Sequence, residues 1–262
     1  MHTTQGRLRR LLWYCCVQPS QDVRAAMDVQ VVCAARPVRA MGRAFIAGVV
    51  TWWLYVPAHE LLHALGCAVT GGTVKELQIA PAYGAALLAR VFPFVTAGGA
   101  YAGRLTGFDT HGSDFVYLAT DGLPFLLTIL LGVPLLKGCA NGERPAVFGA
   151  AVVLALAPFY CLPGDYYEMG AILVTRAVAY CEGDATTMGF AALRSDDVVQ
   201  LINDLWTRPD KLQLRSNAPA PALLISAGLV VGAGLAFTTY ALGAWWFWYA
   251  ARRMCMVTPG SE

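Results

Sequence analysis

The chain has 262 residues, of which 57% are hydrophobic and 14% are charged, and its mean hydropathy is +0.51. This apolar share exceeds that of an ordinary water-soluble domain, so the composition argues against a soluble fold. The formal net charge of +2 gives no reason to expect nucleic acid as a partner.

The N-terminal 43 residues are basic, with seven arginines against Asp22 and Asp28. Arginine clusters favour the anionic, cytoplasmic face of a membrane, so residues 1–43 are predicted to form a cytoplasmic or interfacial tail. A signal peptide is the alternative, because Arg7 to Arg10 precede an apolar run. That run is short and stops at Gln18-Pro19, which favours the tail.

The first apolar segment runs from Ala44 to Thr70 and is interrupted only by His59, Glu60 and His63. It exceeds the roughly 20 residues that a membrane helix needs, so it is predicted to span the bilayer. Residues 71–108 follow, with mixed alternation and several glycines and prolines. We expect a small membrane-associated β-hairpin there, with residues 85–91 in the hairpin and not in a helix.

Further apolar stretches cover residues 115–136 and 145–162, and a shorter one, 166–180, suits a half-helix or a tilted helix. Together with residues 44–70 and the hairpin they form the predicted membrane core, residues 44–180. Residues 181–220 are polar and are expected at the membrane surface, with a helix from Ser195 to Trp206.

The last span is predicted over residues 221–250 of a C-terminal segment, 221–262, in which Trp245 to Tyr249 form an aromatic belt and Arg252-Arg253 an anchor. The predicted fold class is therefore an all-α polytopic membrane protein, a bundle of four to five transmembrane helices with a small hairpin. The 8 cysteines show no metal or disulfide spacing, and most are expected to be small buried hydrophobic residues.

One motif carries chemistry: His59-Glu60-Leu61-Leu62-His63. Histidines four apart lie on one face of a helix and can bind one zinc ion, while the adjacent glutamate can accept a proton from an attacking water. Two histidines and a glutamate are costly in hydrocarbon unless they pair or bind metal. A polar cluster that only joins helices is the simpler alternative, but the motif predicts a functional site.

A catalytic zinc takes a third protein ligand, and three carboxylates qualify. Asp165 is the first choice, because Pro163-Gly164 interrupts the backbone there and can turn a side chain into the bundle. If successive spans alternate in direction, Asp165 shares the depth of His59 and His63. Asp121 and Glu168 remain alternative ligands or residues supporting the ligands, and capping or interhelical hydrogen bonding is the structural alternative for all three.

Residues 44–175 resemble the site-2 proteases, a family of intramembrane zinc metalloproteases. The resemblance is most specific at His59 to Leu65 and at Gly71-Gly72-Thr73-Val74, which resemble the family's first core helix and the glycine turn after it. Asp121 to Pro124 is loosely similar to the Gly-Pro element of the second core helix. Pro163-Gly164-Asp165 stands in place of the Leu-Asp-Gly element, with Tyr166 where the family has glycine and with the family's Asn-Pro represented only by Pro158 or Pro163.

The resemblance implies a zinc metalloendopeptidase for regulated intramembrane proteolysis, with His59, His63 and Asp165 as Zn²⁺ ligands and Glu60 as base and then acid. It implies a transmembrane protein as substrate, captured by an exposed strand within residues 73–92. It also implies a bacterial inner membrane as the location, with the N-terminus cytoplasmic. The sequence does not predict the oligomeric state.

Two other classes of function fit the same residues. One is an inactive, protease-like membrane scaffold, since the region around Asp165 departs from the family pattern. The other is a zinc transporter, because histidine and glutamate within a span can line a metal path. A transporter should show a related polar site in a corresponding helix, and His2 and His111 both lie outside the apolar spans.

Overall fold

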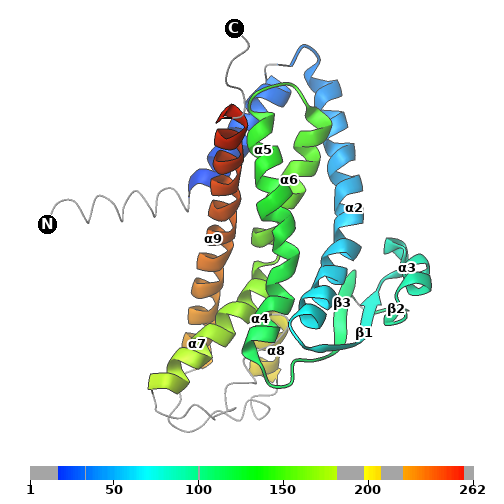
Figure 1. The fold of residues 1–262 in the computed structure, drawn as a ribbon, viewed down its shortest axis with the longest axis vertical. Coiled ribbons are helices and arrows are strands. Elements are labelled where there is room, and N and C mark those ends of the chain that lie inside the picture. The colour runs from blue at the N-terminus through cyan, green and yellow to red at the C-terminus, as the bar shows by residue number, and fades with distance from the viewer. Residues whose placement is uncertain (1–16, 33, 100, 182–197, 208–220, 257–262) are drawn as a thin grey trace, which may run out of the picture. The chain divides into compact units, whose positions relative to one another are not determined.

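The computed structural model describes residues 17–32, 34–99, 101–181, 198–207 and 221–256 (Figure 1). Residues 17–27 are helical and lead into a π-helical turn, Asp28–Val32. The helices and strands that follow are α2 (Pro37–Val69), β1 (Thr73–Ile79), α3 (Ala85–Val91), β2 (Val95–Ala97), β3 (Gly103–Asp109), α4 (Asp114–Gly122), α5 (Val133–Cys139), α6 (Pro145–Tyr160), α7 (Tyr167–Cys181), α8 (Val198–Thr207) and α9 (Pro221–Met256).

Four helical stretches of the described chain are long and apolar enough to cross a membrane: Pro37–Val69, Asp114–Cys139, Pro145–Cys181 and Leu223–Arg253. This count is the lower value of the predicted four to five. The chain forms two compact units, unit 1 from Met1–Pro57, Phe125–Pro158 and Phe237–Glu262, and unit 2 from Ala58–Pro124 and Phe159–Ala236.

The first candidate span begins earlier in the chain than its predicted start at 44. Helix α2 begins at Pro37, so Arg39 and Arg43 belong to its first turns, where both are exposed. Proline suits the first turn of a helix, and arginine is a good helix former whose long side chain can reach water from a helix end. Residues 17–27 are also helical, in place of the predicted tail.

The predicted hairpin is also wrong in its topology. The segment forms a three-stranded sheet of order β2-β1-β3, in which β1 pairs parallel with β2 and antiparallel with β3. Residues 85–91 form helix α3 because Ala, Leu and Arg are strong helix formers, and a parallel pair needs such a crossover. Strand β1 lies in the middle, so within residues 73–92 no strand is at an edge; β2 and β3 are the edges.

The sheet packs against α2 at the turn after the first histidine. Its buried side chains Leu77, Ile79 and Val95 form one apolar cluster with Ala64 of α2 and Ala85 of α3. In Figure 1 the sheet lies to one side of the C-terminal end of α2. Burial of these side chains therefore fixes the sheet beside the helical turns that carry the histidine motif.

The predicted helix break at Pro163-Gly164 is present. A π-helical turn, Leu162–Tyr166, separates α6 from α7, and Gly164 has a non-helical backbone with φ −103° and ψ −106°. Helix α7 matches the predicted half-helix at 166–180, and α8 overlaps the helix predicted from Ser195, a residue outside the described part. Helix α9 extends six residues beyond the predicted end at 250.

Glycines on α9 allow it to approach α7 closely within unit 2. A side chain at Gly170 of α7 would overlap the carbonyl of Gly228, and one at Gly232 would overlap the carbonyl of Tyr166. Gly228 and Gly232 are four residues apart, the spacing that brings membrane helices into backbone contact. Helix α9 therefore supports the turn that carries Asp165.

Of the four cysteines described with their burial, Cys67 and Cys139 are buried, as predicted, whereas Cys161 is half-buried and Cys181 is exposed. Burial of the small, weakly polar thiol is favourable at the first two positions. The prediction therefore holds for only half of these residues.

Candidate metal centre

All six residues that the sequence singled out lie in unit 2. His59, Glu60 and His63 are on α2, and Asp165 is in the π-helical turn before α7. Asp121 is on α4 and Glu168 begins α7. Unit 2 thus contains candidate site residues from α2 and from the helix break more than a hundred residues later in the chain.

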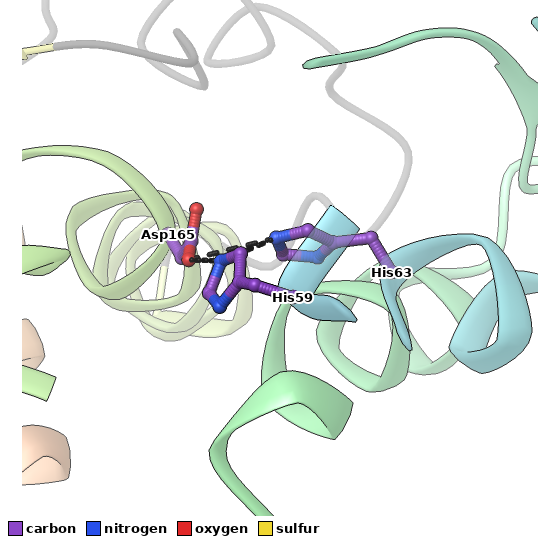
Figure 2. A group of neighbouring side chains, drawn as sticks. All are labelled: His59, His63 and Asp165. Carbon is purple, nitrogen blue, oxygen red and sulfur yellow. Dashed lines mark hydrogen bonds and ion pairs between the residues drawn. The ribbon is translucent and has the colours of Figure 1, made fainter. Parts of the chain in front are cut away.

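The side chains of His59, His63 and Asp165 converge. The Nε2 atom of His59 is 3.0 Å from Asp165 Oδ2 and 3.0 Å from His63 Nε2, and His63 Nε2 is 3.6 Å from the same oxygen. Figure 2 shows both imidazole rings reaching from α2 toward the Asp165 carboxylate. Among the described residues, these three form the group of His, Cys, Asp and Glu side chains that could hold a metal ion.

The geometry of this triangle fits a zinc ion. A tetrahedral zinc with ligand bonds of about 2.0–2.1 Å keeps its ligand atoms about 3.3 Å apart. The three observed separations, 3.0, 3.0 and 3.6 Å, lie on both sides of that value. Two imidazole nitrogens and one carboxylate oxygen are also a donor set typical of catalytic zinc, which leaves one coordination position for a reactant.

A backbone carbonyl sets the orientation of His63. Its Nδ1 is 2.8 Å from the carbonyl oxygen of Thr120, inside the protein. A carbonyl can only accept a hydrogen bond, so Nδ1 carries a proton, and in the neutral ring the lone pair is then at Nε2, on the side of the other two atoms. Metal-binding histidines commonly have a partner of this kind on the second nitrogen.

Close packing of α2 on α4 brings this carbonyl within reach. A Cβ added at Gly66 would lie 3.1 Å from both the carbonyl carbon of Ala119 and Cβ of Leu123. Gly66 is three residues after His63, on the same side of the helix. Sequence reasoning missed Thr120, because a main-chain acceptor leaves no signature in residue type.

The Asp165 carboxylate is the more accessible part of the group. Its side chain is 23% exposed, against 8% for His59 and 9% for His63. The non-helical Gly164 directly before it lets the chain turn Asp165 toward α2 instead of continuing a regular helix. A reactant can therefore approach from the Asp165 side, while the histidines are shielded.

Glu60 lies next to the converging atoms and against the sheet. A Cβ added at Gly103, the first residue of β3, would lie 2.9 Å from Glu60 Cδ and 3.2 Å from Oε1. The side chain is half-buried. A candidate proton acceptor, adjacent to His59 in the chain, thus lies against an edge strand.

Asp121 and Glu168 do not belong to the three-atom group. Glu168 Oε2 accepts a hydrogen bond of 3.0 Å from the Tyr117 hydroxyl, and Glu168 also interacts with Asp121. Both carboxyl groups are buried, and Asp121 Oδ2 has no hydrogen-bond partner among the described residues. Of the three carboxylates that the sequence offered, the structure brings only Asp165 to the histidines.

Comparison with protein-family models, curated proteins and solved structures finds no match for this chain. The geometry of the site is therefore the basis for assigning a function.

Proposed function

We propose that this chain is an intramembrane zinc metalloendopeptidase that hydrolyses a peptide bond in or near a transmembrane segment of another membrane protein. The observation that carries the proposal is the convergence of His59, His63 and Asp165, two of them from the His-Glu-x-x-His motif and the third from a helix break. In this proposal the four candidate spans cross a membrane, which is expected to be a bacterial inner membrane with the basic N-terminus cytoplasmic.

The three ligating side chains would hold Zn²⁺, which supplies Lewis-acid chemistry by making a water molecule a better nucleophile and by polarising the peptide carbonyl. Glu60 accepts a proton from the attacking water as the water oxygen bonds to the carbonyl carbon of the substrate. Glu60 then gives a proton to the amide nitrogen as the carbon–nitrogen bond breaks. His63 stays in one orientation throughout because of the Thr120 carbonyl.

The sheet supports a peptide as the substrate. A helical substrate hides its peptide bonds, so the segment to be cleaved must be extended, and an extended segment can pair with the edge of a sheet. Strand β3 is an edge of this sheet, and its first residue, Gly103, contacts Glu60. A substrate strand added to β3 would run close to Glu60, the proton acceptor. Neither a transporter nor a scaffold requires an edge strand beside a proton acceptor.

The test compares wild-type protein with Glu60→Gln, both purified and reconstituted in lipid vesicles with a panel of single-span model substrates. We expect about one zinc per chain in both proteins and fragments formed at least about a hundredfold more slowly by Glu60→Gln, because the amide keeps the shape of the side chain but cannot accept the proton. Mass spectrometry identifies the cleaved bond.

Other outcomes of this experiment would replace the proposal. Equal cleavage by wild type and Glu60→Gln would remove Glu60 from the mechanism, and absence of zinc from both would remove the metal. Zinc movement across the vesicle membrane without fragments would favour a transporter. Zinc in both proteins with neither fragments nor transport would favour the scaffold.

A further inference from the structure

The contact between Gly103 and Glu60 joins an edge strand to the proposed proton acceptor. A Cβ at Gly103 would lie 2.9 Å from Glu60 Cδ, 3.2 Å from Oε1 and closer still to Cγ. Real Cβ atoms do not approach other heavy atoms so closely, so the outer part of the Glu60 side chain lies against a backbone surface that only glycine leaves open.

The position of Gly103 is itself fixed by the sheet. Gly103 is the Cα partner of Ile79 in the β1–β3 ladder, and the amide of Ala80 donates a 3.0 Å hydrogen bond to the carbonyl of Ala102. Ile79 is fully buried, in the apolar cluster that includes Ala64 of α2. Gly103 is thus connected through the sheet to the same helix that carries Glu60.

A glutamate side chain has three rotatable bonds, and a general base works only when its oxygen is within hydrogen-bond reach of the proton that it accepts. An unrestrained glutamate side chain samples several rotamers. The observed Glu60 side chain lies against the Gly103 backbone, in space that any Cβ at that position would occupy.

We propose that Gly103 is a positioning residue for the reaction: it gives the Glu60 side chain the one place beside β3 from which its carboxylate reaches the metal centre. This inference rests on the proposed function, because it assigns Glu60 as the proton acceptor. Gly103 itself touches neither metal ligand nor substrate carbonyl in this role; it acts through Glu60.

The central test is Gly103→Ala, assayed for zinc content, kcat and KM on the model substrate that wild type cleaves. The added methyl group meets the end of a flexible side chain, so we expect the protein to fold and hold about one zinc while Glu60 shifts. A misplacement of about 1 Å costs about a hundredfold in rate, so kcat should fall about a hundredfold with KM changed less than about threefold.

Two glycine variants provide matched controls. Gly107→Ala lies in the same strand, but its Cβ would meet Cβ and the backbone nitrogen of Glu76, each at 2.9 Å. It disturbs β3, the proposed substrate edge, without touching Glu60, so it should lower stability and raise KM while costing much less in kcat than Gly103→Ala. Gly138→Ala, in α5, meets no heavy atom within 4 Å and should change neither quantity.

A double-mutant cycle separates positioning from a general effect on the fold. In a Glu60→Gln background the base is already lost, so adding Gly103→Ala should leave the residual rate unchanged. If Gly103→Ala alone folds poorly, Glu60→Ala with Gly103→Ala should recover the stability and zinc content of Glu60→Ala, because Cγ of residue 60 is gone.

Full kcat in zinc-loaded Gly103→Ala overturns the inference, as does an equal loss of rate in Gly107→Ala. A hundredfold loss that persists on top of Glu60→Gln also overturns it, since Gly103 would then act on something other than Glu60. If wild type itself holds no zinc or cleaves no substrate, the proposed function fails, and that result is separate from every outcome of the glycine series.

Discussion

Polar side chains occur inside both compact units, but they are satisfied differently. In unit 1, the Gln30 side chain is fully buried and donates hydrogen bonds of 2.6 Å to the carbonyls of Cys139 and Gly142, while its oxygen accepts from the amide of Arg144. Asp22 is paired with Lys137 at 2.9 Å and accepts a hydrogen bond from Tyr240. Each polar group there has a complementary partner within the chain.

In unit 2, three side-chain atoms that could hold a metal ion converge on each other. His59 Nε2 is 3.0 Å from both His63 Nε2 and Asp165 Oδ2, so the three groups face one another instead of each facing a separate partner. Imidazole nitrogens and a carboxylate oxygen in this arrangement are the donors that a zinc ion uses. The comparison separates polar groups that complete the fold from polar groups arranged for a ligand.

The largest expected effect is loss of the metal on His63→Ala or His59→Ala. Removing one of three protein ligands should reduce the zinc content from about one per chain to background and abolish cleavage, because a two-ligand site binds zinc weakly. Elemental analysis of purified protein measures it. Metal content equal to wild type in both variants would contradict the zinc site.

Asp165→Asn should have the next largest effect on the metal. A neutral amide is a much poorer zinc ligand than a carboxylate, so we expect affinity to fall at least about tenfold. Glu168→Gln and Asp121→Asn should change it less, because neither residue belongs to the converging group. Competition with a chromogenic chelator gives the affinities. Release of zinc by Glu168→Gln while Asp165→Asn retains it would transfer the ligand role to Glu168.

At Gln30 in unit 1, a substitution is expected to lower stability and not zinc affinity. Gln30→Leu leaves two carbonyls and one amide of the 139–144 segment without their partner, and each unsatisfied buried group costs about 1–3 kcal/mol. The free energy of unfolding should fall by at least about 3 kcal/mol, with zinc affinity of the folded protein unchanged. Denaturant titration in detergent micelles measures the first quantity. Loss of zinc from folded Gln30→Leu would show that the two polar clusters are not independent.

The smallest expected effect is at Glu76 on β1, a half-buried residue outside the candidate spans. Hydrogen bonds from Gln78 at 3.2 Å and Thr96 at 3.0 Å hold the pKa of Glu76 below its ordinary value of 4.5. The ionised form is favoured by folding, so this contribution is present at neutral pH and disappears as the pH falls through the lowered pKa. Carboxyl NMR titration should give a pKa below 4.5 in wild type and a rise in Thr96→Val.

The sequence predicts much of the candidate site because its chemistry follows from spacing. Histidines four apart on one helix must share a face, and Pro163-Gly164 must interrupt a helix, so His59, His63 and Asp165 could all be named in advance. Thr120 could not, because a backbone carbonyl contributes the same atom whatever the residue. Gly103 could not, because its importance depends on which side chain the fold places beside it.

The long apolar helices can be predicted from segment length and hydropathy. The strand pairing and the burial of single polar residues cannot, because they depend on tertiary contacts. The four apolar spans follow from bilayer thickness. The short apolar run 85–91 lies between glycines and prolines and shows little periodicity, so the sequence predicts a hairpin there. Its composition, Ala-Ala-Leu-Leu-Ala-Arg, nevertheless favours the helix that the structure has. Gln30 was overlooked because a glutamine in a basic segment gives no sign that it will be buried.

The glycine contacts of α9 can form only late in synthesis, because α9 follows all the candidate ligands in the chain. The ribosome completes Asp165 more than fifty residues before it reaches Gly228 and Gly232, whose backbone contacts support α7 and the Tyr166 carbonyl. A nascent chain that ends near residue 220 therefore contains every proposed ligand but lacks the helix that braces the third. We expect such a chain to acquire zinc poorly, so that competence to cleave arises only after the last helix has been inserted and has packed against α7.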